Sequence, residues 1–143
     1  MGTDVASTRT AGRWLVLAGR IAGAGLTGWS AGIHLYLWYN GYRDIETVGP
    51  LFLVNAIGGF ILAVAILVVP TRFLTIVSGL SALYAASVLG ALILSLTVGL
   101  FGFFESTVAQ LVTTTLVINS VAFLVLTAFT VIRVVRARRE HAQ

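Results

Sequence analysis

The chain has no cysteine and no lysine, and only 10% of its 143 residues are charged. Without cysteine there can be no disulfide framework, thiolate zinc site, iron–sulfur cluster or thiol redox chemistry. Soluble domains carry roughly 25% charged residues, so a soluble enzyme of this composition would lack the polar groups to cover its surface. The 15 glycines follow no triplet period, which excludes collagen.

Long uncharged apolar stretches take the place of the missing polar residues. Hydrophobic residues make up 58% of the chain, and the mean hydropathy is +0.99. Four stretches reach the length of about 20 residues that a helix needs to cross a hydrocarbon core. We therefore predict an all-α fold, an integral membrane four-helix bundle, as a single transmembrane domain over residues 1–143. The predicted helices cover 17–39, 49–69, 73–98 and 107–132, and the tails cover 1–13 and 134–143.

The placement of arginine predicts the orientation of these helices. Arg43 stands alone in one connection, whereas eight arginines share the other side of a four-span arrangement: Arg9, Arg13, Arg20, Arg72, Arg133, Arg136, Arg138 and Arg139. Cytoplasmic segments carry an excess of basic residues, so both termini are predicted to be cytoplasmic in a plasma (inner) membrane. The basic tail then acts as an orientation signal beside anionic lipids, and no nucleic-acid partner is expected.

Small and polar residues predict how the helices pack. Interfaces between membrane helices are rich in small residues and in hydroxyl groups. Three ladders of such residues recur at four-residue spacing: Ala24, Gly28 and Gly32, with Gly19 and Gly23 upstream; Asn55, Gly59 and Ala63; Ser78, Ala82, Ala86 and Gly90. Internal packing is favoured for these ladders, with a homo-oligomer seam as the alternative. Thr113, Ser120 and Thr127 recur every seven residues in the last helix, as interhelical contacts or as the lining of a ligand path.

A ligand pocket is predicted where the 40–48 and 99–106 connections meet the helix ends. At a rise of 1.5 Å per residue, His34 lies roughly 8 Å below its helix end, and Asn55 and Gln110 reach similar depths. An ionisable residue inside a membrane indicates a functional site, although one hydrogen bond would also satisfy a neutral histidine. The candidate ligand-binding residues are His34, Asn55, Gln110, Arg43, Asp44, Glu46 and Glu105. For the charged loop residues, solvation or mutual pairing is the alternative.

Known membrane chemistries find little support in the sequence. A b-type haem normally takes two axial histidines, and only His34 lies in a predicted span, because His141 lies in the tail. No acid lies within a span, which disfavours proton-coupled multidrug export. No residues have metal-ligand spacing, and no nucleophile has an adjacent base, so we predict no catalytic activity, no metal and no cofactor.

In architecture the chain resembles the small, uncharacterised four-helix bacterial inner-membrane proteins with short loops and arginine-marked ends. It also resembles the DoxX-like class in size and helix count. These resemblances imply a compact membrane bundle, and they carry no functional residues over to this chain.

Two functions remain open at this point. The first is a non-enzymatic accessory or scaffold subunit of a larger membrane assembly, which the small soluble mass and the small-residue ladders favour. The second is binding or transport of a small hydrophobic molecule, a lipid or a quinone, at an outer-leaflet pocket around His34.

Overall fold

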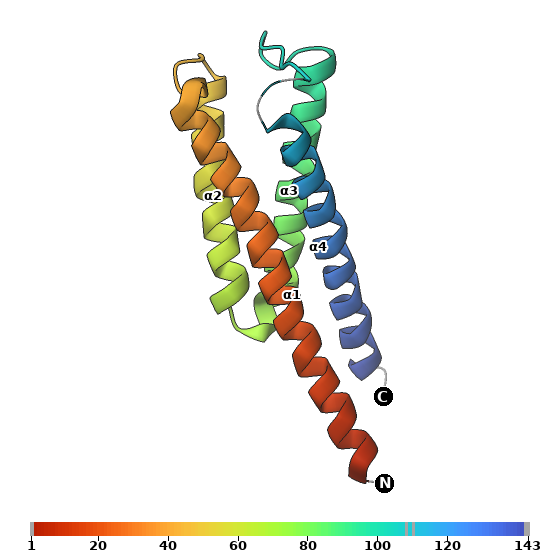
Figure 1. Cartoon of the computed structure of the whole chain (residues 1–143). Coiled ribbons are helices and arrows are strands. Elements are labelled where there is room, and N and C mark those ends of the chain that lie inside the picture. The colour runs from red at the N-terminus through yellow and green to blue at the C-terminus, as the bar shows by residue number, and fades with distance from the viewer. Residues whose placement is uncertain (1, 108, 110, 142–143) are drawn as a thin grey trace.

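The chain folds into four long α-helices (Figure 1), seen in a computed structural model that describes residues 2–107, 109 and 111–141. The helices are α1 (Gly2–Leu37), α2 (Val48–Val68), α3 (Leu74–Thr97) and α4 (Val112–His141). A π-helical turn, Trp38–Tyr42, follows α1, and a 3₁₀ turn, Thr71–Phe73, precedes α3. The prediction of an all-helical chain is confirmed. Three segments of the described chain are long and apolar enough to cross a membrane: Val48–Val68, Thr71–Thr97 and Val112–Arg139.

Two helices begin elsewhere than predicted. α1 begins at Gly2 and not near residue 17, because its polar first turns continue the helix beyond the apolar stretch that hydropathy detects. α4 begins at Val112 and not near residue 107. The preceding segment turns back over the end of α3: Gly99 and Gly102 have φ of +85° and +79°, and the Glu105 N–H donates to the Ser95 carbonyl at 3.0 Å.

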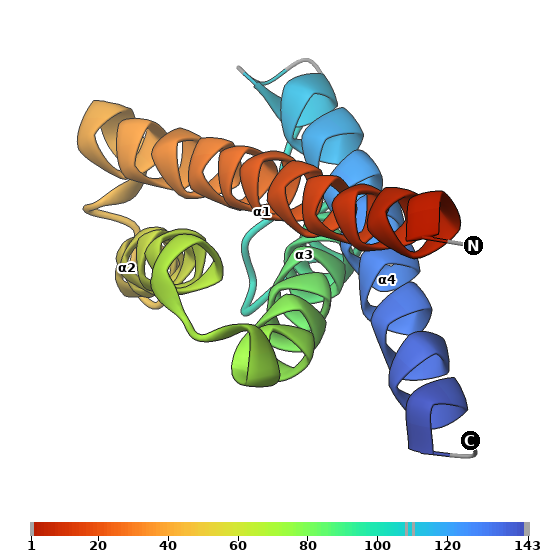
Figure 2. The same ribbon diagram turned by 90° about the horizontal axis from the view of Figure 1, so that it is seen from below.

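The four helices form two antiparallel hairpins, α1–α2 and α3–α4. Within the first hairpin the backbones approach closely at Gly59, where an added Cβ would lie 2.8 Å from the Cβ of Ala31. The hairpins meet mainly through α1 and α4, which cross obliquely in the view along the bundle (Figure 2). At this contact the Ser30 hydroxyl donates to Oδ1 of Asn119 at 2.9 Å.

The two ends of the bundle differ in their packing. We call the end with the 38–47 and 98–111 connections the loop end, and the end with both termini and the 69–73 turn the termini end. A hydrophobic core with residues from all four helices fills the half of the bundle nearer the termini end. Two of its members, Ile66 and Leu74, lie on either side of the 69–73 turn. The members of this core are Ala24, Ile66, Leu74, Ala82, Ala85, Ala122, Leu126 and Phe129.

Two arginines connect helices at the termini end. The Arg20 guanidinium donates to the carbonyls of Ile66, Leu67 and Val69 at 2.5, 2.7 and 2.6 Å. These carbonyls lie at the C-terminus of α2, where a cation also meets the negative end of the helix dipole. Arg133 in α4 donates to the Thr71 carbonyl at 2.6 Å and to the Thr75 hydroxyl at 3.0 Å. Each arginine therefore fastens its own helix to the partner helix of its hairpin.

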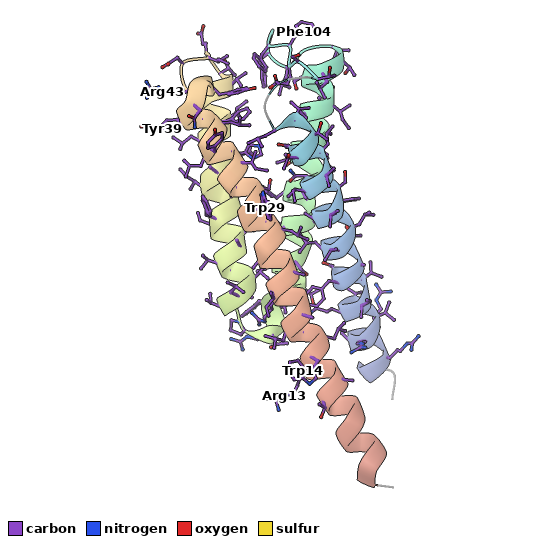
Figure 3. All side chains as sticks on the ribbon, viewed as in Figure 1. Arg13, Trp14, Trp29, Tyr39, Arg43 and Phe104 are labelled. Carbon is purple, nitrogen blue, oxygen red and sulfur yellow. The ribbon has the colours of Figure 1, made fainter. Side chains whose placement is uncertain are left out.

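The surface of the bundle carries many large apolar side chains. Large hydrophobic side chains are exposed on all four helices, and Trp14 and Trp29 point away from the bundle (Figure 3) with 65% and 60% of their surface exposed. The interior instead holds eight buried polar side chains among the described residues: Thr27, Ser30, His34, Ser78, Ser81, Ser95, Thr115 and Asn119. Sixteen hydrophobic residues of the described chain are buried with them, so the feature that differs from a water-soluble protein is the number of large hydrophobic side chains that stay exposed.

The predicted ladders coincide only partly with the helix contacts. Gly59 and Ala63 are buried in the first hairpin. Gly32 and Gly90 face open space, since no atom lies within 4 Å of an added Cβ at either position. The close approaches of α1 to α4 occur at Gly19 and Gly23, where an added Cβ would collide with Phe129 and Leu126.

Candidate functional site

A cavity of about 280 Å³ lies between the two hairpins at the loop end. All four helices and the 98–111 connection contribute to its wall. Most of the wall is apolar, with Leu37, Phe52, Val88, Leu92 and Val112 as examples from each helix. Its polar side chains are His34, Asn55, Ser87, Ser95, Thr115 and Glu105. An apolar cavity with a few polar groups is typical of a small-molecule site.

His34 is the buried ionisable group of this wall, with 6% of its surface exposed. Its Nδ1 lies 2.8 Å from the carbonyl oxygen of Ser30, one helical turn earlier in α1. The imidazole ring also packs against the ring of Phe52 in α2, with centroids 5.2 Å apart. The Ser30 carbonyl can only accept, so Nδ1 carries the proton and Nε2 of the neutral ring is an acceptor.

Behind His34, a hydrogen-bonded layer connects α1 to α4 and α2 to α3. Ser30 donates to Oδ1 of Asn119, and the Asn119 amide donates to the Thr115 carbonyl at 2.9 Å. Asn119 is fully buried, so the layer satisfies a side chain that would otherwise be costly to bury. In α3, the Tyr84 hydroxyl donates to the Asn55 carbonyl at 3.1 Å. These bonds fix the backbone that positions His34 and Asn55.

Residues 100–105 of the connection between α3 and α4 line the cavity and are fastened to the first hairpin. The Tyr42 hydroxyl donates to Oε2 of Glu105 at 2.6 Å. The Tyr42 ring stacks on Phe52 at 4.6 Å and meets the edge of Phe103 at 5.9 Å. Burial, the hydrogen bond to Glu105 and the charge of that carboxylate all raise the pKa of the Tyr42 hydroxyl. Tyr42 therefore joins the two hairpins above the cavity in its neutral form.

The seven candidate residues divide into three groups. His34, Asn55 and Glu105 line the cavity. Arg43 and Asp44 do not: they pair with each other at 3.4 Å on the exposed surface, with Arg43 at the top of the bundle in Figure 3, and Glu46 is exposed in the same connection. Gln110 lies outside the described residues. His34 and Asn55, which were predicted from their depth along the helices, thus share the cavity, whereas the charged residues of the 40–48 connection lie away from it.

Several residues that line the cavity or contact its wall were not singled out by the sequence. Phe52 and Phe103 are ordinary apolar residues of a span and a loop, and Tyr42 reads as part of an interfacial aromatic belt like exposed Tyr39. Ser30 offered a signal, because it lies one helical turn before His34 on the same face. Among the described residues, no three His, Asp, Glu or Cys side chains gather as a metal site.

Comparison of the chain with known protein families, curated proteins and solved structures found no match.

Proposed function

We propose that the protein binds a small hydrophobic molecule in the cavity at the loop end, from within a plasma (inner) membrane that it crosses four times. The observation that carries the proposal is the composition of the wall: apolar side chains from four helices around one buried histidine whose Nε2 is an acceptor. Such walls gain from burying apolar ligand surface, while a few polar groups fix the orientation of the ligand.

Membrane insertion is supported by the exposed apolar surface of the bundle. Among the described residues α1 is not one of the three segments that composition alone marks as long and apolar enough to cross a membrane, but its polar side chains Thr27, Ser30 and His34 are buried in the bundle. Its exposed face carries Ile21, Trp29 and Leu35, and it packs along α2 from the termini end to the loop end. We therefore propose that α1 crosses the bilayer beside α2.

The arginines set the proposed orientation. Arg20, Arg72 and Arg133 all lie at the termini end, beside the 69–73 turn, and an excess of basic residues marks the cytoplasmic side. Reporter fusions near residues 5, 71 and 140 are expected to report the cytoplasm, and fusions near 43 and 104 the outside. A C-terminal fusion that reports the outside would contradict the four-span arrangement.

The binding proposal is tested by filling the cavity. Ala91 lines the cavity, whereas its neighbour Gly90 is exposed and has open space around it. Wild type, Ala91→Phe and Gly90→Phe are purified in mild detergent, and their bound lipids and quinones are quantified by mass spectrometry. We expect a bound molecule in wild type and Gly90→Phe and its loss from Ala91→Phe. The same molecules in all three proteins, or none in wild type, would contradict the proposal.

A second function, an accessory or scaffold subunit of a larger membrane assembly, is favoured by the outer face of α4. Thr113 and Ser120 are exposed there on an otherwise apolar surface, and half-buried Thr127 continues the seven-residue spacing. Hydroxyl groups at this spacing hydrogen-bond across helix interfaces in membranes. A stoichiometric protein partner that co-purifies with wild type and Phe123→Leu but not with Ser120→Leu would support this function. Identical partners for all three would count against it.

A further inference from the structure

We infer that the molecule bound in the cavity has an aromatic hydroxyl head that donates a hydrogen bond to Nε2 of His34. This inference rests on the proposed binding function, and it names the chemical class that the wall selects.

The backbone of α1 determines the hydrogen-bonding role of the His34 ring. Nδ1 donates to the Ser30 carbonyl, and in the described part of the chain this is the hydrogen bond that the ring makes. Glu105 lines the same cavity but forms no ion pair with the ring, so among the described residues no carboxylate at contact distance holds His34 as a cation. In the neutral ring the lone pair of Nε2 then needs a donor. A ketone, an ester or an ether cannot supply one.

The other polar groups of the wall also offer mainly acceptors. The hydroxyl hydrogens of Ser87 and Ser95 go to the carbonyls of Tyr84 and Leu92, each at 2.8 Å. Asn55 directs one amide N–H to the Leu51 carbonyl at 3.0 Å. Its second N–H and the Thr115 hydroxyl, which can donate or accept, are the exceptions. A ligand that donates therefore finds several acceptors, whereas a ligand that only accepts leaves Nε2 of the buried His34 without a donor.

Charge and shape narrow the class further. An ammonium head also donates, but moving a full charge into a mostly apolar wall costs far more than moving a hydroxyl, and the two oxygens of the Glu105 carboxylate already accept from the Tyr42 hydroxyl and the Ser106 N–H. Phe52, Phe101 and Phe103 line the cavity, and aromatic side chains favour stacked or edge-on contacts with a ring. A volume of about 280 Å³ lies near the lower limit for ligand pockets and suits a single ring with a short tail.

A matched pair of probes tests this inference. 4-Butylphenol and 4-butyltoluene differ by a hydroxyl in place of a methyl group. Their dissociation constants are measured by calorimetry on the full-length protein in lipid nanodiscs, with empty nanodiscs as the reference for partitioning. We expect the phenol to bind about five-fold more tightly, the effect of one net hydrogen bond. In His34→Phe, or in His34→Met if the phenylalanine variant does not fold, we expect the two constants to become equal.

The outcomes separate this inference from the binding function. Equal binding of both probes to wild type, or tighter binding of 4-butyltoluene, overturns the hydroxyl head and leaves the cavity as a hydrophobic site. A phenol preference that survives in both His34 variants overturns His34 as the acceptor. Failure of both probes to bind wild type overturns this inference and counts against the cavity as a ligand site as well.

Discussion

Adding one methyl group at Gly59 is expected to destabilise the bundle, although the same change at Gly58 is not. Alanine is the better helix former by about 1 kcal/mol at either position. At Gly58 no atom lies within 4 Å of the new Cβ, so that gain remains. At Gly59 the new Cβ would lie 2.8 Å from the Cβ of Ala31 and 2.6 Å from the Tyr84 hydroxyl.

The size of the effect at Gly59 follows from these distances. Carbon atoms pack best at about 3.5–4.0 Å, so α1 and α2 must separate by roughly 0.7–1.2 Å along this contact. Overpacking of this kind costs about 1–3 kcal/mol. The Tyr84 hydroxyl must also move from its 3.1 Å bond to the Asn55 carbonyl, a loss of about 1 kcal/mol. The loss therefore exceeds the gain in helix propensity, and Gly59→Ala should be less stable than Gly58→Ala by roughly 2–4 kcal/mol.

The assay is thermal unfolding of both variants and wild type in the same detergent, followed by far-ultraviolet circular dichroism. We expect Gly58→Ala to unfold at or above the temperature of wild type, and Gly59→Ala clearly below it. An unfolding temperature of Gly59→Ala equal to that of Gly58→Ala would refute the close approach of α1 and α2 at this glycine.

Three further predictions concern single side chains. Thr27 is buried with no hydrogen-bond partner for its hydroxyl among the described residues. The near-isosteric Thr27→Val should therefore raise the free energy of unfolding by about 1–3 kcal/mol, and with it the unfolding temperature. An unchanged or lower unfolding temperature would contradict this. Arg20→Ala should lower the unfolding temperature. Arg20→Lys should unfold at a temperature between those of Arg20→Ala and wild type, because an ammonium group cannot match three guanidinium hydrogen bonds to carbonyls of the α2 C-terminus. An unfolding temperature of Arg20→Lys equal to that of wild type would indicate that charge alone matters. Since the fold raises the pKa of Tyr42 above its ordinary value of about 10, the folded state favours the neutral phenol. This contribution to stability is fully present below about pH 10 and is lost as the pH rises above it. Between pH 9 and pH 11, roughly one unit either side of that value, the unfolding temperature of wild type should therefore fall by more than that of Tyr42→Phe. An equal fall in both proteins would contradict the burial of this hydroxyl.

The sequence predicted the helices better than their ends. An uncharged apolar stretch of about 20 residues predicts a helix long enough to cross a bilayer. It does not detect a polar extension of that helix, such as residues 2–16 of α1. The late start of α4 at Val112 depends on the turn around Gly99 and on the bond from Glu105 to the Ser95 carbonyl. That hydrogen bond joins the connection to α3, so the sequence around Glu105 alone does not predict it.

The candidate site was predictable to the extent that it depends on depth along the helices. His34 and Asn55 share the cavity because helices of equal rise bring residues at equal depth to one level. Which face of a helix packs against a neighbour depends on the other helices, and the sequence of one helix does not show it. Gly32 shares the four-residue spacing of Gly28 yet faces open space, while Gly23 makes the close contact with α4.

The cavity follows from the way in which the hairpins are fastened. At the termini end, Arg20 and Arg133 bind backbone carbonyls inside each hairpin, and the buried core fills the space between the hairpins. At the loop end the hairpins diverge (Figure 1), and the Tyr42–Glu105 bond with its aromatic neighbours spans the space above the cavity. A molecule that fills this space supplies apolar contacts that the side chains there do not make. Its binding energy then adds to the stability of the fold by mass action. A rise in unfolding temperature with ligand concentration is therefore a direct measure of which molecules the cavity accepts.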